Sequence, residues 1–83
     1  METVKKGSKG EPVVQLQTKL NKLGFKLNPD GQFGEATHNA VITVQSIFGY
    51  TVDGVVGQGT WNLMDQQIGL KWNLELARKA FAK

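Results

Sequence analysis

The chain of 83 residues contains no cysteine, one histidine (His38) and two serines (Ser8 and Ser46). The absence of cysteine excludes disulfide bonds and thiolate metal sites. A Ser-His-Asp arrangement is possible only through His38, and a histidine-rich zinc site is excluded. The hydrophobic fraction of 40% suffices for one small core, but not for a deep enclosed active site as well. This composition favours a single-domain binding module over an enzyme, and we expect no metal and no cofactor.

Positive charge is missing from the middle of the chain. Residues 27–70 contain no lysine or arginine and carry four acidic residues, whereas residues 1–26 carry six lysines and two glutamates. A protein that reads duplex DNA would carry cations along its recognition helix, so we do not expect nucleic acid as a partner.

No segment approaches the roughly 20 apolar residues that cross a bilayer, and we expect no membrane partner. Because the first seven residues lack the apolar core of a signal peptide, we expect synthesis in the cytoplasm.

Three helices are predicted by apolar residues at spacings of three and four, each run being followed by a glycine. The predicted ranges are 12–23, 35–48 and 58–68, and the glycines that follow them are Gly24, Gly49 and Gly69. Pro12 suits the first position of a helix because it needs no partner for an amide hydrogen. A capping box formed by Ser8 and Glu11 is the alternative start for the first helix.

A fourth helix is predicted over residues 72–82. Its wide apolar stripe contains Leu70, Leu74, Ala77 and Phe81. We therefore expect a domain over residues 1–69, followed by a C-terminal helix within 70–83 that could lead into a catalytic domain.

The strongest pattern in the sequence is an internal repeat with a period of 23 residues. Residues 30–41 align without gaps onto residues 53–64, and both copies read D-G-x-apolar-G-x-x-T-x-N-apolar-apolar. In each copy the aspartate can accept amides of its own turn, and the first glycine can supply a positive φ. The second glycine would let the backbone enter the helix with no side chain in the way, and the threonine can bond back to the turn. The predicted turn residues are Asp30, Gly31, Gly34 and Thr37, and their counterparts Asp53, Gly54, Gly57 and Thr60.

An apolar residue followed by glutamine precedes each copy, as Leu16-Gln17 and as Val44-Gln45. The two glutamine side chains can bond the backbone of the neighbouring turn or contact a ligand directly. Two helix-turn-helix units that share the middle helix would pack about a pseudo-twofold axis.

With these motifs the sequence resembles the small three-helix peptidoglycan-binding domain that accompanies many cell-wall hydrolases, including phage endolysins. The resemblance covers residues 4–69. It rests on Val4-Lys5-Lys6-Gly7-Ser8-Lys9-Gly10, on Leu16-Gln17, and on the two D-G-x-x-G-x-x-T copies, the second followed by Trp61. Val44, where the family often has phenylalanine, and Gln58-Gly59, which replace a proline-containing helix start, are departures. The resemblance implies an all-α fold: a compact three-helix bundle with two pseudo-symmetric helix-turn-helix repeats, here with an extra C-terminal helix.

The resemblance further implies a non-catalytic module that anchors a linked lytic enzyme, such as a phage endolysin, to bacterial peptidoglycan. We expect a monomer that is released to the cell wall and binds the glycan strand or the stem peptide there. Glycine-rich turns at helix starts offer amide hydrogens to carbonyls and carboxylates, so we expect the ligand in a groove beside the two turns. The predicted ligand-binding residues are Gln32, Gln45, Asp53, Trp61 and Asn62, with a core position as the alternative for Trp61.

Other functions would account for fewer of the residues in these motifs. A hydrolase or metal-dependent enzyme would have to use His38 with acidic residues, and the identical turn contexts of Asp30 and Asp53 already explain those two carboxylates. A calcium loop lacks its first acidic ligand, because Lys26 and Gly49 occupy that position in the two copies. A protein-interaction module would dock through the apolar stripe of the last helix.

Overall fold

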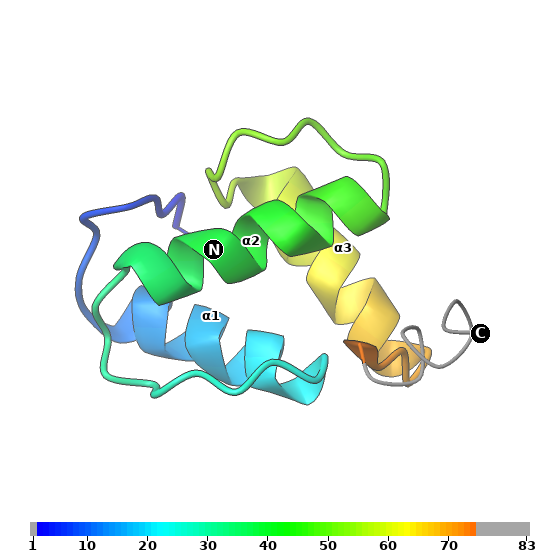
Figure 1. Cartoon of the computed structure of the whole chain (residues 1–83), viewed down its shortest axis with the longest axis horizontal. Helices are drawn as coiled ribbons and strands as arrows, with labels where there is room; N and C mark the ends of the chain where they lie inside the picture. Colours follow the sequence, from blue (N-terminus) through cyan, green and yellow to red (C-terminus); the bar gives the residue numbers. More distant parts are fainter. Residues whose placement is uncertain (1, 75–83) are drawn as a thin grey trace.

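The computed structural model describes residues 2–74 and contains three α-helices (Figure 1). Helix α1 spans Glu11–Lys22, α2 spans Glu35–Ile47 and α3 spans Gln58–Gly69. Helix α1 packs against both α2 and α3. Within the described range the extended pairings are isolated bridges, so the prediction of an all-α three-helix fold is confirmed. Residues 75–82 of the predicted fourth helix lie outside the described residues.

The start of α1 differs by one residue from the prediction. Glu11 is the first helical residue and Pro12 the second, after a Gly10 N-cap with a φ of 111°. Proline loses nothing at this position, because the first amides of a helix have no intrahelical acceptor. The hydroxyl of Ser8 accepts the amide of Lys5 at 3.0 Å instead of capping α1, so the capping-box alternative is wrong.

All three helices end in a residue with a positive φ. Gly24 and Gly49, with φ values of 104° and 73°, end α1 and α2 as predicted. Helix α3 continues through Gly69, and the residue with a positive φ is Lys71, at 59°. Its amide and that of Trp72 donate to carbonyls of the last turn and close the helix. The predicted end at residue 68 is therefore one residue short, and the residue with a positive φ lies two positions after the predicted Gly69, because the terminating bonds form without a glycine.

The core lies between the three helices and is closed by residues of the connecting segments. Trp61 is the largest fully buried side chain. The apolar faces predicted for the first three helices point into this core, although Phe48, just after α2, and Ile68 of α3 are only partly buried. The buried apolar residues of the cluster are Val4, Val13, Leu16, Leu20, Leu23, Phe33, Ala40, Val41, Val44, Val56, Trp61, Leu63 and Met64.

The N-terminal segment is hydrogen-bonded to the segment before α3. Val4 and Val56 exchange two backbone hydrogen bonds, of 3.1 and 2.8 Å. The indole Nε1 of Trp61 donates to the carbonyl oxygen of Glu2 at 2.8 Å. These bonds satisfy the polar atom of the buried indole and hold the second repeated turn against the bundle.

Residues 70–74 return to the end of α1. The amide of Leu74 donates to the carbonyl oxygen of Leu23 at 2.7 Å, and the Leu74 side chain is 8% exposed. A Cβ added at Gly24 would lie 2.9 Å from the Leu74 amide nitrogen. Leu70, placed on the same predicted stripe, is 69% exposed. Part of the stripe that a docking partner would use is therefore packed against α1. None of the helices in residues 2–74 has the length and apolar character needed to cross a membrane.

Candidate functional site

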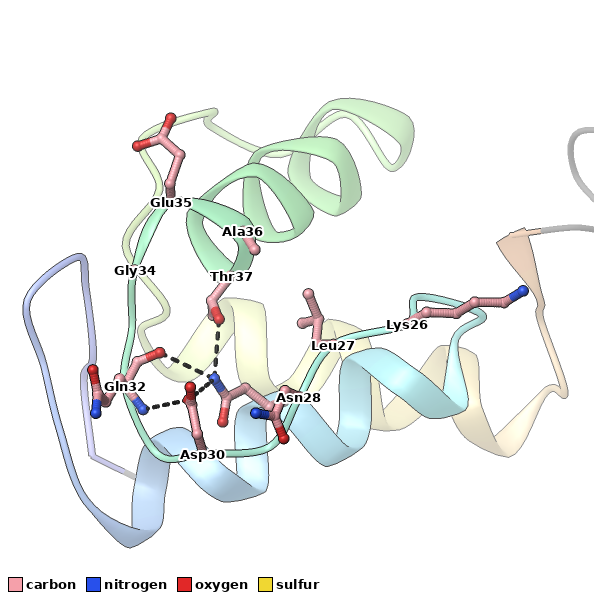
Figure 2. Close-up of a pocket in the computed structure, with 10 residues that line it drawn as sticks. Lys26, Leu27, Asn28, Asp30, Gln32, Gly34, Glu35, Ala36 and Thr37 are labelled. Carbon is pink, nitrogen blue, oxygen red and sulfur yellow. Dashed lines mark hydrogen bonds between the residues drawn. The ribbon is translucent and has the colours of Figure 1, made fainter.

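The first repeated turn is organised by the buried side chain of Gln17, on α1. Its Oε1 accepts the amide of Gly31 at 2.9 Å. Its Nε2 lies 3.0–3.1 Å from three acceptors: Asp30 Oδ1, the carbonyl oxygen of Gln32 and Thr37 Oγ1 (Figure 2). A single amide thus joins α1, the turn and the first residues of α2.

The second repeated turn has the same arrangement around Gln45, on α2. Its Oε1 accepts the amide of Gly54 at 3.0 Å. Its Nε2 lies 3.0 Å from Asp53 Oδ1, 3.0 Å from the carbonyl oxygen of Val55 and 3.3 Å from Thr60 Oγ1. The prediction that both glutamines bond the neighbouring turn is confirmed. In both copies the partners occupy the same positions of the 23-residue repeat.

The two aspartates serve the turns in which they lie. Asp30 Oδ1 accepts the amide of Gln32, and Asp53 Oδ1 accepts the amide of Val55, both at 2.9 Å. These backbone amides, helped by the glutamine side chains, hold the pKa of each aspartate below its ordinary value. Both carboxylates are therefore ionised at neutral pH.

The glycines of the repeat have two different roles. Gly31 and Gly54 have φ values of 78° and 71°, as predicted. A Cβ at Gly54 would also lie 2.5 Å from Cε1 of His38, so the imidazole occupies the space beside this turn. Gly34 and Gly57 are the N-caps of α2 and α3, and a Cβ at either would meet nothing within 4 Å. The steric reason predicted for these two glycines is therefore wrong.

A hollow of about 270 Å³ lies beside the first turn. Figure 2 shows Asp30, Gln32 and Thr37 close together in the lining, with Lys26 at the far end. The lining residues are Gln17, Lys26, Leu27, Asn28, Asp30, Gln32, Gly34, Glu35, Ala36 and Thr37. Glu35 forms an ion pair with Lys6, which lies in the segment before α1.

A second hollow, of about 230 Å³, lies beside the second turn. Its lining residues are Gln45, Tyr50, Thr51, Asp53, Val55, Gly57, Gly59 and Thr60. Residues 50, 51, 53, 55, 57, 59 and 60 correspond in the repeat to residues 27, 28, 30, 32, 34, 36 and 37, all of which line the first hollow. The repeat therefore produces two hollows with equivalent walls, each bordered by the start of a helix.

Two predicted ligand-binding residues are exposed and line the hollows: Gln32 the first and Asp53 the second. Gln45 also lines the second hollow, but it is 1% exposed and its amide is engaged by the turn. The structure thus brings Gln45 and Asp53 together and places Gln32 in the other hollow.

The remaining two predicted residues line neither hollow. Trp61 is fully buried, so the prediction that it binds the ligand is wrong and the core alternative is confirmed. Asn62 is exposed on α3, where its Oδ1 accepts Nε2 of Gln58 at 2.9 Å. Within residues 2–74 no three His, Asp or Glu side chains are grouped so that they could hold a metal ion.

Tyr50 lines the second hollow and was missed by the sequence reasoning. It is 42% exposed, whereas Leu27, at the equivalent position of the first copy, packs partly against the core. Extending the repeat by three residues toward the N-terminus would have aligned the two positions and revealed the aromatic difference.

The sequence and the fold both match proteins that act on the cell wall. The family described as a putative peptidoglycan binding domain matches residues 9–64. The zinc D-Ala-D-Ala carboxypeptidase of Streptomyces albus G is 43% identical over 67 residues, which are 77% of this chain and 26% of that protein. The chain thus spans about a quarter of that relative.

Two solved structures share the fold. The SleB N-terminal domain has a TM-score of 0.77 and 34% identity, with 81% of this chain and 93% of that chain covered. The endolysin of Burkholderia phage AP3 has a TM-score of 0.73 and 35% identity, with 76% of this chain and 24% of that chain covered. The resemblance drawn from the repeated turns is confirmed: the chain belongs to the family of peptidoglycan-binding domains, and it is a non-catalytic module whose target is peptidoglycan.

Proposed function

We propose that the chain tethers a linked lytic domain to the cell wall by binding peptidoglycan in the two hollows beside the repeated turns. The observation that carries this proposal is the recurrence of one lining: positions equivalent in the repeat surround both hollows. A polymer with a repeating unit suits a protein with a repeated site, because two weak contacts on one chain combine into firmer attachment.

The walls of the hollows suit the polar groups of peptidoglycan. Gly34 and Gly57, at the N-caps of α2 and α3, line the hollows, and no side chain caps either helix. The first amides of each helix can therefore donate to acetamide, peptide or carboxylate oxygens of the ligand. The exposed side chains of Gln32 and Asp53 add polar atoms that can bond hydroxyls and amides.

Binding by such open sites is weak. Neither hollow encloses its ligand, and we expect a dissociation constant of tens of micromolar, or about −6 kcal/mol. This affinity is sufficient because tethering raises the local concentration of the linked domain on an insoluble polymer. We propose that the parent protein is a peptidoglycan hydrolase, of which a phage endolysin is one example, and that the module itself acts as a monomer.

The proposal is tested by sedimentation with purified, protein-free sacculi. The wild-type chain at tens of micromolar should be depleted from the supernatant, and the turbidity of the sacculi should stay constant because the module does not cleave them. No depletion would contradict the proposed function.

Two substitutions and a matched control locate the site. Gly34→Trp and Gly57→Trp each place a bulky side chain at the wall of one hollow, where the backbone leaves room for a Cβ. Gly69→Trp makes the same change on α3, away from the lining of either hollow, and a Cβ there also meets nothing within 4 Å. Each hollow variant should weaken sedimentation and the control should not. Equal binding by all three variants would exclude the hollows as the site.

A further inference from the structure

The two hollows differ at the position occupied by Tyr50. Tyr50 is 42% exposed and lines the second hollow, whereas the first hollow has Leu27, which packs partly against the core. Tyr50 Cε2 lies 3.5 Å from the place where a Cβ of Gly59 would stand. The ring therefore lies beside the first turn of α3, at a glycine that has no side chain to cover it.

The backbone fixes the base of this aromatic side chain. The amide of Tyr50 donates to the carbonyl oxygen of Gln45 at 2.8 Å, in the bonded turn that ends α2. A tyrosine has only two side-chain torsions, so a ring attached to a fixed backbone loses little conformational entropy when a ligand covers it. The second hollow thus combines a flat apolar surface with polar walls. This combination fits a sugar ring, which presents C–H bonds on its faces and hydroxyls at its edge.

The charge of the second hollow favours a neutral occupant over an anionic one. Among the residues of the described range 2–74 that line it, Asp53 is the only charged one, and Gln45 Nε2 and the Val55 amide each donate to one of its carboxylate oxygens. A carboxylate repels the carboxylates of stem peptides and accepts hydrogen bonds from hydroxyls. The first hollow, by contrast, is lined by charges of both signs, from Lys26, Asp30 and Glu35.

From this geometry we infer that the second hollow holds the pyranose ring of an N-acetylhexosamine of the glycan strand, with one face on Tyr50 and its hydroxyls donating to Asp53. The inference rests on the proposed function, since it names the part of the polymer that occupies one of the two proposed sites.

The test is a titration of the 15N-labelled chain with a peptide-free N-acetylglucosamine tetramer. The amides of Tyr50, Asp53, Gly57 and Gly59 should shift more than those that line the first hollow. Tyr50→Ala should weaken binding about tenfold, equivalent to 1.4 kcal/mol. Tyr50→Phe, which keeps the ring, should bind within about twofold of the wild type.

The matched control is Val52→Ala, because Val52 is 50% exposed in the same turn but does not line the hollow. This variant should bind the tetramer as the wild type does. If the wild-type chain sediments with sacculi but the tetramer shifts none of these amides, or if Tyr50→Ala binds the tetramer normally, the inference is overturned and the proposed function stands. If the wild-type chain does not sediment with sacculi, the proposed function itself fails.

Discussion

Replacing Gln17 by leucine should remove much of the stability of the domain. Leucine is close to glutamine in size, so it creates little cavity and isolates the loss of the amide group. The Oε1 of Gln17 accepts the Gly31 amide, and its Nε2 contacts the Thr37 hydroxyl, both in buried surroundings. Its other partners, Asp30 and Gln32, are exposed residues, and their hydrogen bonds to Gln17 are only partly buried.

The magnitude follows from the two buried partners. Leaving a buried donor or acceptor unpaired costs about 1–3 kcal/mol, so Gln17→Leu should lower the free energy of unfolding by roughly 3 kcal/mol. A domain of this size has a total stability of roughly 4–12 kcal/mol. A loss of 3 kcal/mol corresponds to a fall in Tm of roughly 12–24 °C.

Urea denaturation and thermal unfolding, followed by circular dichroism, measure this loss. Gln15→Leu is the matched control, because it makes the same chemical change at an exposed position of the same helix. The control should change the free energy of unfolding by no more than about 0.5 kcal/mol. A loss below about 1 kcal/mol for Gln17→Leu would refute the claim that the buried amide organises the first turn.

Three further predictions concern the turns and the last helix end. Gly54→Ala should cost more than about 2 kcal/mol, because alanine is strained at a φ of 71° and its Cβ would overlap the neighbouring imidazole. Gly57→Ala should cost less than about 1 kcal/mol in the same denaturation assay, and equal losses would contradict the strain argument. Lys71→Gly should raise the free energy of unfolding by about 1 kcal/mol, because glycine takes the positive φ without strain, and an unchanged urea midpoint would argue against this. Asp30 and Asp53 should contribute their full share of the free energy of unfolding above pH 3.8, the ordinary pKa of aspartate. This contribution should be lost on acidification, as the pH falls through the lower pKa values that the two carboxyls have in the folded state. Asparagine at both positions should flatten this part of the stability–pH curve, and an unchanged slope would contradict the role given to the two carboxylates.

The helices and their starts were accessible from the sequence because local signals specify them. Apolar stripes and following glycines placed all three helices to within one residue at either end. The residue with a positive φ after α3 was missed, because Lys71 adopts a conformation that is typical of glycine. A few backbone hydrogen bonds of the last turn determine the conformation of Lys71, and no residue pattern predicts these bonds.

The residues that build the turns were predictable because the same motif occurs twice in the sequence. The 23-residue repeat predicted the roles of the turn residues, and the glutamine that precedes each copy was a candidate to bond that turn. The role of Trp61 was not fixed in this way, since its counterpart in the repeat is His38 and the two positions differ in burial. Burial depends on segments far away in the sequence, here on Val4 and Glu2, which cover the second turn and bond the indole.

The hollows could be placed only roughly from the sequence. A groove beside the turns was expected. That there are two hollows with equivalent lining residues depends on the positions of side chains, which the sequence does not give. Gln32 and Asp53 lie where a ligand could reach them, and their contact with the ligand remains a prediction. Leu74 shows the same limit at the other end of the chain, because its place against the end of α1 depends on close contact with Gly24.

The most direct test of the central claim is a nuclear magnetic resonance titration of the 15N-labelled chain with a soluble disaccharide-peptide released from peptidoglycan. Binding at the repeated turns predicts saturable shifts that cluster at the amides of residues 27–37 and 50–60. Shifts confined to the exposed faces of the helices, or no shifts at millimolar ligand, would contradict the account.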